Sequence, residues 1–553
     1  MIEIILYPGC HQNKNAIYLS PLCFVNEINY KDFDFLDLDI DKIKSDFYLR
    51  QIEKYIDENL ESITKNAFPE HYNFFPLHYW RRILYSQIFY STSLIFKIEK
   101  MFELISNQDF LYKIKVLNKN QIYPFKDFNI YEIDGFNLFK ITSLILLEKK
   151  FDKIKLLPFT NSHLINKNTT ITHNIFQSIK QRIFNSIQFL LKNVKMGYGI
   201  NVLDSIILQI KLPRKKSKKI EFKPKSENKL NSKIDWRLNL IMELISSDFK
   251  KTLSNYLNRF KSGSFRHNNK VKLVQNTLFA DFKELIISNL GSLNGQLIIP
   301  SQHGGDLFYN NDLFKKNLEK TYNYYISWRK RSNSCEQNIL FLPSPLFSKV
   351  FDTYNQLNNN VILVGTQIIK FNAGFDGWFI NSKEVFRYRE SKIQLINFLL
   401  NRETANFFYR PYFSSPKNAL PDYKFFKKIF PELRIIKSNL HNEIKNCKLL
   451  IMDHPGTTLS LALSMNVPFL LYFEDMKYFG IDKSSPMINK FIELNILFTD
   501  LNKFKKHYNT IIDDPQSWWK SIEMQDLRNF FLDKYAFCDK KWRSKWIQQL
   551  KEI

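Results

Sequence analysis

The sequence predicts an α/β protein with two Rossmann-like domains that face a cleft, and with helical additions in the N-terminal half. Apolar runs of strand length alternate with helical stretches, and Leu449–Phe473 reads as one complete strand–turn–helix–strand unit. Within it, Leu449–Met452 has the length of a buried strand, Pro455-Gly456 breaks regular structure, and a second apolar run follows at Val467–Phe473. The turn of such a unit lies at the carboxyl end of a parallel strand, where open α/β sheets bind ligands.

The helix expected after this turn has the features of an anion site. Gly456 precedes two hydroxyl residues, Thr457 and Thr458, and the free N–H groups of a helix start attract phosphate. An ordinary threonine cap is the structural alternative. We predict that Gly456, Thr457 and Thr458 bind a phosphate.

Length and composition predict more than one domain. A chain of 553 residues exceeds one ordinary domain, and 44% hydrophobic residues are enough to bury large cores. We predict an N-terminal α/β domain over 1–335, a C-terminal α/β domain over 336–515, and closing helices over 516–553 that cross back to the N-terminal domain. The run NILFLPSP from Asn338 is predicted to be the first strand of the C-terminal domain. The further strands expected there are Val361–Thr366, Asn406–Tyr409, Leu433–Ile436, Leu449–Met452 and Val467–Phe473.

The basic charge is concentrated in one segment. The net charge is +26, and residues 211–233 set ten Lys and Arg against only Glu221 and Glu227. We favour a solvated insertion; contact with anionic lipid is the functional alternative. Nucleic acid is not expected as a partner, because no recognised RNA- or DNA-binding pattern accompanies the charge.

Cysteine usage and hydropathy bear on the location of the protein. The five cysteines form no C-x-x-C pair, which suits a reducing cytoplasm. The N-terminus lacks the pattern of a signal peptide, and no apolar run approaches the roughly 20 residues that span a bilayer. We expect a cytoplasmic protein, peripheral at most on the inner face of the membrane.

His303 is the candidate general base. It follows the predicted strand Leu297–Pro300 and precedes Gly304 and Gly305, whose small size lets a substrate approach the imidazole. Histidine titrates near neutrality and commonly acts as a base, although a structural hydrogen bond in a loop is the alternative. Asp306 either orients the ring or caps the next helix, and we favour the cap.

Other polar residues follow predicted strands. Arg410 suits bidentate recognition of phosphate, with a surface ion pair as the alternative. Asp453 and His454 are neighbours on a segment expected to be extended, where adjacent side chains point to opposite faces. We therefore expect one of the two to face the cleft and the other to pack.

An acidic series near the N-terminus offers a metal hypothesis. D-x-D triplets hold the metal that bridges a nucleotide diphosphate in some sugar transferases. The favoured interpretation is an edge strand or loop with one wet face. The series comprises Asp32, Asp34, Asp37, Asp39 and Asp41.

Several separated segments together resemble a family of bacterial transferases associated with surface carbohydrate biosynthesis. The resemblance runs in order over nearly the whole chain, and its most telling piece is the stretch Tyr79–Leu84 behind His71. The segments are Ala16–Cys23, His71–Ser86, Gln302–Gly305, Leu342–Pro345, Tyr409–Arg410 and Asp453–Pro468.

The C-terminal half also resembles GT-B glycosyltransferases, especially those that use cytidine nucleotides to build sialic-acid, Kdo or teichoic-acid polymers. The resemblance implies that His303 is the base, and that Arg410 and the helix start at Thr457 and Thr458 contact the donor phosphate. Two departures leave the nucleotide open: Ser460 stands where such families often carry an acidic residue, and no histidine separates Arg410 from Pro411.

We therefore predict a metal-independent glycosyltransferase without a cofactor, which takes a nucleotide sugar, CMP- or CDP-linked, and a carbohydrate or lipid-linked glycan acceptor. Two alternatives remain: a metal-dependent GT-A-like transferase that uses the Asp32–Asp41 series, and a non-enzymatic protein that binds anionic polymers or membrane surfaces. The further predicted donor or acceptor contacts are Asp453, His454, Ser460, Gly304, Gly305 and Asp306.

Overall fold

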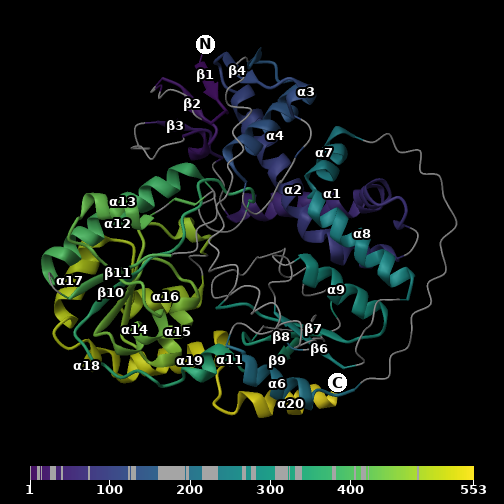
Figure 1. Cartoon of the computed structure of the whole chain (residues 1–553). Helices are drawn as coiled ribbons and strands as arrows, with labels where there is room; N and C mark the ends of the chain where they lie inside the picture. The colour runs from purple at the N-terminus through teal and green to yellow at the C-terminus, as the bar shows by residue number, and fades with distance from the viewer. Residues whose placement is uncertain are drawn as a thin grey trace.

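The computed structural model contains three parallel sheets and many helices (Figure 1). It describes residues 2–8, 13, 15–24, 33–38, 42–72, 75–122, 125, 133–159, 194, 199–214, 235–263, 270–275, 282–305, 322, 324–330, 339–375, 381–403, 406–412, 419–420, 422–481 and 485–553. The predicted α/β class is confirmed. The strands of the N-terminal half are divided between two sheets.

The first sheet has five parallel strands in the order β3-β2-β1-β4-β5. Its strands are β1 (Ile2–Ile5), β2 (Ile17–Tyr18), β3 (Asp34–Phe35), β4 (Tyr112–Val116) and β5 (Ile154–Pro158). β3 is an edge strand, as the favoured interpretation of the acidic series requires. The short helices in this region are η1 (Pro21–Cys23) and α3 (Lys119–Ile122).

Long helices between β3 and β4 form the helical addition predicted for the N-terminal half. α1 (Lys42–Ala67) and α2 (Leu77–Ser106) pack against each other, and Trp80 of α2 is fully buried beside Phe68. The helices that complete this region are α4 (Gly135–Glu148), α7 (Trp236–Leu244), α8 (Ser247–Lys261) and α9 (Phe282–Leu293).

The second sheet has four parallel strands, ordered β6-β7-β8-β9. They are β6 (Lys272–Gln275), β7 (Ile298–Ser301), β8 (Tyr325–Ser327) and β9 (Ile339–Phe341). The prediction that the run from Asn338 is the first strand of the C-terminal sheet was wrong, because β9 pairs with β8, a strand that the sequence did not reveal. A short apolar run indicates a strand but does not specify its partner. α11 (Pro345–Lys349) follows β9.

The third sheet has six parallel strands, ordered β12-β11-β10-β13-β14-β15. They are β10 (Val361–Val364), β11 (Phe407–Arg410), β12 (Arg434–Ile435), β13 (Leu449–Met452), β14 (Phe469–Tyr472) and β15 (Leu497–Phe498). The five strands predicted for this region are confirmed, and β15 is an addition. The strand order reverses between β10 and β13, which makes the carboxyl ends of these two strands the expected ligand crevice.

Helices connect the strands of the six-stranded sheet. They are α12 (Ser382–Glu403), α13 (Asp422–Ile429), α14 (Leu440–Asn446), α15 (Thr457–Met465), η5 (Met476–Phe479) and α16 (Pro486–Glu493). The helices that follow β15 are α17 (Leu501–Ile511), α18 (Pro515–Trp519), α19 (Ile522–Tyr535) and α20 (Trp542–Glu552).

The last helix lies under the four-stranded sheet, beside α6 (Val202–Lys211) (Figure 1). Trp546 of α20 is buried in the same apolar cluster as Ile299 of β7, and its indole N–H donates to the carbonyl of Pro343 at 2.9 Å. In the described part of the chain, no helix is both long enough and apolar enough to cross a bilayer.

Candidate functional site

The helix start predicted to bind an anion is present at the carboxyl end of β13. β13 ends at Met452, and α15 begins at Thr457 after a bend, with Gly456 as its N-cap. Gly456 has no side chain that can satisfy the first N–H groups of the helix, and no side-chain cap bond forms there. The N–H of Leu459 donates to the carbonyl of Gly456 at 3.0 Å, so the candidate donors for an external anion are the N–H groups of Thr457 and Thr458.

The His303 turn is held by a buried network of neutral hydrogen bonds. The Gln302 side-chain oxygen accepts from the Ser327 hydroxyl at 2.9 Å and from the Trp328 backbone N–H at 3.2 Å. The Gln302 amide and the Trp328 indole both donate to the carbonyl of Gly304, at 3.1 and 2.8 Å. Gly304 has a φ of +70°, a conformation that favours glycine. The network presents His303, which is partly exposed, at the end of β7.

The two predicted halves of the site meet at Gly305. Its N–H donates to Thr457 Oγ1 at 3.3 Å, so a turn from the four-stranded sheet contacts the first residue of a helix from the six-stranded sheet. A Cβ atom on Gly305 would lie 2.3 Å from Ser460 Oγ, so a larger residue at this position would require the Ser460 side chain to move. Thr458 and Ser460 are buried beneath the contact. The predicted contact Asp306 lies outside the described residues.

Asp453 and His454 interact directly, so the expectation that they point to opposite faces was wrong. His454 Nδ1 lies 2.9 Å from Asp453 Oδ1, and both residues are buried. The physical reason is a bend: the chain leaves the extended conformation after Met452, and both side chains turn to the same side. Asp453 Oδ1 also accepts the backbone N–H of Thr366, which follows β10. The pair therefore lies at the point where the strand order reverses.

A buried ionic network that includes residues of α12 supports Asp453. Lys392 Nζ of α12 lies 2.8 Å from Asp453 Oδ2 and 2.9 Å from Asp422 Oδ2. Asp422 is further held by Arg389 Nε at 3.2 Å and by the Tyr409 hydroxyl at 3.0 Å. We call these five residues the Lys392 network.

The charges of this network shift the acidity of its members. Burial raises the pKa of Asp453, but the Lys392 ammonium and the His454 hydrogen bond outweigh burial and lower it to about 2. The pKa of Lys392 is raised, because Asp422 and Asp453 together outweigh the desolvation of the ammonium. The Asp453 carboxylate therefore stays ionised and fixes the orientation of the His454 ring.

Arg410 ends β11 on the same sheet edge, and one of its hydrogen bonds lies on the side away from α15. Its Nη1 donates to the carbonyl of Ile436, directly after β12, at 3.2 Å. Burial lowers the pKa of its guanidinium, with Glu443 acting in the opposite direction. Thus His303, Thr457 and Ser460 are gathered at one junction, while Arg410 flanks it across two strands.

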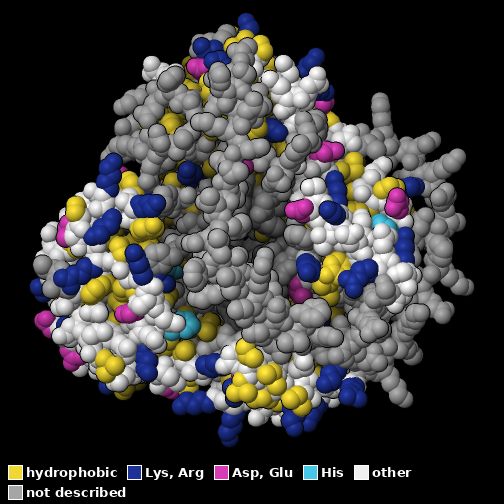
Figure 2. All heavy atoms as spheres, viewed as in Figure 1, with side chains coloured by type: hydrophobic (Ala, Val, Ile, Leu, Met, Phe, Trp, Pro, Cys, Tyr) yellow, Lys and Arg dark blue, Asp and Glu magenta, His cyan; other side chains and the backbone are white. Residues whose placement is uncertain are grey.

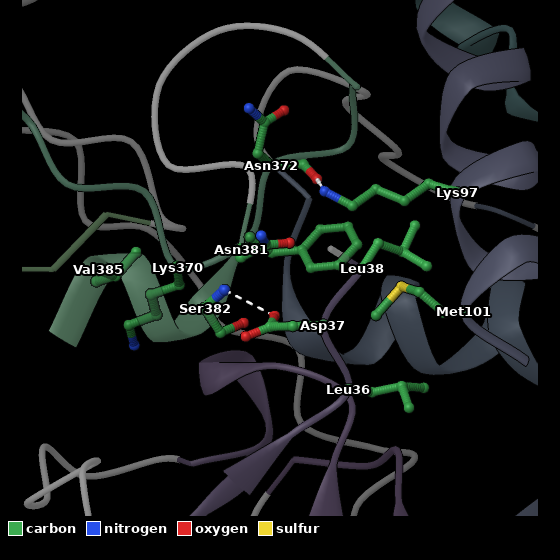
Figure 3. Close-up of a pocket in the computed structure, with 11 residues that line it drawn as sticks. Leu36, Asp37, Leu38, Lys97, Met101, Lys370, Asn372, Asn381, Ser382 and Val385 are labelled. Carbon is green, nitrogen blue, oxygen red and sulfur yellow. Dashed lines mark hydrogen bonds between the residues drawn. The ribbon is translucent and has the colours of Figure 1, made fainter. Parts of the chain in front are cut away.

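The acidic series takes a structural role where it is described. Both carboxylate oxygens of Asp37 accept backbone N–H groups at the start of α12, from Ser382 at 2.8 Å and Lys383 at 2.9 Å (Figure 3). Across a cavity of about 10 Å³, Lys97 of α2 donates to the carbonyl of Asn372 at 2.8 Å. Asp37 therefore joins the first sheet to α12. Asp32, Asp39 and Asp41 lie outside the described residues.

A groove of about 500 Å³ opens at the carboxyl ends of β14 and β15, between α12 and the edge strand β3. Its volume is in the range that accommodates a small substrate. Aromatic and charged side chains both line it; they include Phe33, Phe386, Tyr472, Arg387, Glu390 and Glu474. No group of three or more His, Cys, Asp or Glu residues suited to a metal ion occurs within the described part of the chain.

Sequence comparison decides the family. The family model of the LIC12162 family transferases matches residues 9–550, nearly the whole chain. The chain belongs to the LIC12162 family of transferases. The expectation of a transferase family is thereby confirmed, while the surface-carbohydrate role and the cytidine nucleotide stay predictions.

Other comparisons of this family member give weaker likenesses. No curated protein matches it. Solved structures similar to it include MnaA of S. aureus with UDP, at 11% identity and a TM-score of 0.35, covering 55% of this chain and 80% of that one. UDP-GlcNAc 2-epimerase of Neisseria meningitidis bound to UDP-GlcNAc has 9% identity and a TM-score of 0.34, covering 55% and 81%. The spinosyn forosaminyltransferase SpnP has 9% identity and a TM-score of 0.28, covering 54% and 79%. Likenesses this low carry no weight for the activity.

Sequence reasoning missed the residues that hold this transferase's site together. Gln302 and Trp328 lie 26 positions apart and meet only through β7 and β8. Arg389 and Lys392 are three positions apart and thus share one face of α12, which is a signal that the sequence does contain. Paired cations on a helix usually face solvent, and nothing local reveals that Asp422 and Asp453 lie opposite them.

Proposed function

We propose that this transferase moves a sugar from a nucleotide-activated donor to a hydroxyl group of a carbohydrate acceptor, without a metal ion. The observation that carries the proposal is the junction of two sheets at Gly305 and Thr457. A histidine turn and a helix start, the two parts that such a transfer needs, lie within one contact of each other.

The donor phosphate is assigned to the start of α15. Gly456 leaves the first-turn N–H groups uncapped, and the Thr457 hydroxyl is partly exposed beside them. Backbone donors and the positive end of a helix stabilise a departing phosphate as its charge develops. A metal ion is then not needed for this role. Arg410 would contact the nucleotide from the β12 side, so we expect it to contribute less than Thr457.

His303 is assigned as the base. As the acceptor oxygen bonds to the anomeric carbon, the bond from that carbon to the phosphate oxygen breaks and His303 takes the hydroxyl proton. The Gln302 and Trp328 hydrogen bonds to Gly304 fix the turn, so that little reorganisation is required. Asp453 and His454 would contact the donor from the other side of the crevice.

The groove beside β14 and β15 is assigned to the acceptor. A lining that contains both aromatic and charged side chains suits a sugar, which offers both C–H surfaces and hydroxyl groups. The proposal places the reaction in the cytoplasm, where the free thiols Cys23, Cys447 and Cys538 would stay reduced. The non-enzymatic alternative does not fit membership of a transferase family.

The test measures nucleotide release from CMP-, CDP-, UDP- and GDP-linked sugars in the presence of EDTA, with water or mixed oligosaccharides as acceptor. We expect turnover with one nucleotide class, and a loss of about 10²- to 10⁴-fold in kcat for His303→Ala. His441→Ala, a change on α14, is the matched control and should keep the wild-type rate. Wild-type turnover by His303→Ala would contradict the assigned base, and loss of all turnover in EDTA would contradict the metal-independent reaction.

A further inference from the structure

Helix α6 exposes its aliphatic side chains to solvent. Val202, Leu203, Ile206 and Ile210 are 40%, 60%, 41% and 67% exposed. Their spacing places them along one side of the helix. We call these four residues the α6 patch. Figure 2 shows hydrophobic side chains gathered over α6 at the bottom of the view, with Lys and Arg side chains along the lower margin.

The same helix buries two of its polar residues. Asp204 and Ser205 are fully buried, and Asp204 forms ion pairs with Arg543 of α20, at 2.5 Å, and with Lys349 of α11. A surface helix normally turns its apolar stripe inward and its charges outward. α6 departs from this rule on both faces, with only Leu208 anchoring it in the apolar cluster below.

A helix cap and two ion pairs fix the orientation of α6, so the exposure of the α6 patch is a property of the fold. A capping box between Asn201 and Asp204 begins the helix. The Asp204 carboxylate is fully buried, while the side chains of Lys349 and Arg543 are 29% and 42% exposed. Rotating the helix to hide the patch would move this buried carboxylate away from both cations. The fold therefore keeps four aliphatic side chains exposed to water. This exposure costs free energy, which a binding partner that covers the patch would recover.

Positive charge adjoins the patch. Lys211, the last residue of α6, and Arg214, three residues later, are exposed. The sequence that follows to residue 233 contains eight further Lys against two Glu. The patch itself contains no aromatic residue, whereas the central contacts of protein interfaces are enriched in Trp and Tyr.

We propose that the α6 patch docks this protein on an anionic lipid bilayer, with the aliphatic side chains in the acyl boundary and Lys211 and Arg214 among the headgroups. Aliphatic burial combined with cationic flanks is the chemistry by which in-plane helices bind membranes. The inference concerns a surface apart from the Gly305–Thr457 junction and stands independently of the transfer reaction.

The test is co-sedimentation of the full chain with vesicles of phosphatidylcholine containing phosphatidylglycerol, and with vesicles of phosphatidylcholine alone. We expect binding to the anionic vesicles that weakens with salt. Ile206→Glu with Ile210→Glu should weaken it at least about tenfold, since apolar burial drives insertion. Ile522→Glu, a change at a 77% exposed position of α19, is the control and should bind like wild type.

A second arm tests the charges. Lys211→Gln with Arg214→Gln should weaken binding to anionic vesicles by about fivefold per charge and leave binding to neutral vesicles unchanged. Circular dichroism should show that all the variants are folded, because the substituted side chains are exposed. Equal binding to both vesicle types, no binding to either, or a dimer that dissociates in the Ile206→Glu, Ile210→Glu variant would overturn the proposal.

Discussion

The two halves of the candidate site are held by opposite kinds of interaction. The His303 turn rests on neutral hydrogen bonds from Gln302 and Trp328. Across the junction, Asp453 and His454 rest on the buried charges of the Lys392 network. Neutral hydrogen bonds contribute about 1 kcal/mol each and do not depend on pH. A buried ion pair contributes little net stability while intact, but its disruption leaves an uncompensated charge.

The difference shows how one junction combines a turn supported by neutral hydrogen bonds with a neighbouring pair supported by buried charges. The hydrogen bonds from Gln302 and Trp328 that support the His303 turn involve no charged group. The Asp453 side is locked in one ionisation state by Lys392. Substitutions and pH should therefore affect the two halves very differently.

The largest effect is expected from removing the central cation. Lys392→Ala leaves the buried carboxylates of Asp422 and Asp453 facing each other, which should lower the free energy of unfolding by about 3–5 kcal/mol. Urea unfolding measures this. Lys383→Ala, an exposed lysine on the same helix, should change stability by less than about 0.5 kcal/mol. Similar values for the two variants would mean that the network carries no buried charge.

The second largest effect is expected from acid, which should reduce the stability contributed by the Asp453 half and leave that of the His303 half unchanged. Because the pKa of Asp453 is lowered to about 2 from an unfolded value of 3.8, its contribution is present above the unfolded pKa and is lost as pH falls through the folded one. That contribution is about 2 kcal/mol. Unfolding measured from pH 5 down to pH 2 should show this loss in the wild type and not in Asp453→Asn. A Gln302→Leu variant should keep the full acid dependence, since it alters only the neutral half.

Adding a methyl group at Gly305, where the two halves touch, should lower the free energy of unfolding. Gly305→Ala places a Cβ about 2.3 Å from Ser460 Oγ, and overpacking of this kind should cost about 2 kcal/mol. Ser460→Ala should recover part of the loss in the double variant, which a double-mutant cycle measures. Simple additivity of the two changes would show that the halves do not touch in solution.

Glu384, at the start of α12, should give a smaller pH dependence of stability, with the opposite sign to that of Asp453. Burial raises the pKa of Glu384 to about 7, with Asp37 and Asp475 adding to the shift. The stability linked to its protonation is present below the unfolded value of 4.5 and is lost as pH rises through 7. Glu384→Gln should remove this dependence, a gain of about 1 kcal/mol at pH 8 after allowance for its partial exposure. Thermal unfolding of both proteins at pH 5 and pH 8 checks this, and parallel curves would contradict it.

The six-stranded sheet and the helix start were predictable because their signals are local. Leu449–Met452 is apolar throughout and fully buried, and Pro455-Gly456 marks the turn in the sequence itself. The bend that joins Asp453 to His454 was not predictable, because it depends on Lys392 and Thr366 from other strands and helices.

Partners distant in sequence explain the remaining differences. The run from Asn338 was recognisable as a strand, but its place beside β8 depended on a three-residue strand that carries almost no signal of its own. Asp37 was recognisable as acidic, but its role required the start of α12, 345 positions away. His303 and Thr457 could each be singled out from their neighbours, whereas the contact of their segments through Gly305 depends on how two sheets pack.

The most direct test of the central claim, that the Gly305–Thr457 junction binds a nucleotide without metal, is a thermal-shift titration with CMP, CDP, UDP and GDP in EDTA. At about 100 times its Kd, one nucleotide should stabilise the wild type by about 2.7 kcal/mol. Thr457→Val should lose this stabilisation, and Thr510→Val, an exposed position on α17, should keep it. Equal stabilisation of Thr457→Val and wild type, or no stabilisation by any of the four nucleotides, would contradict the account.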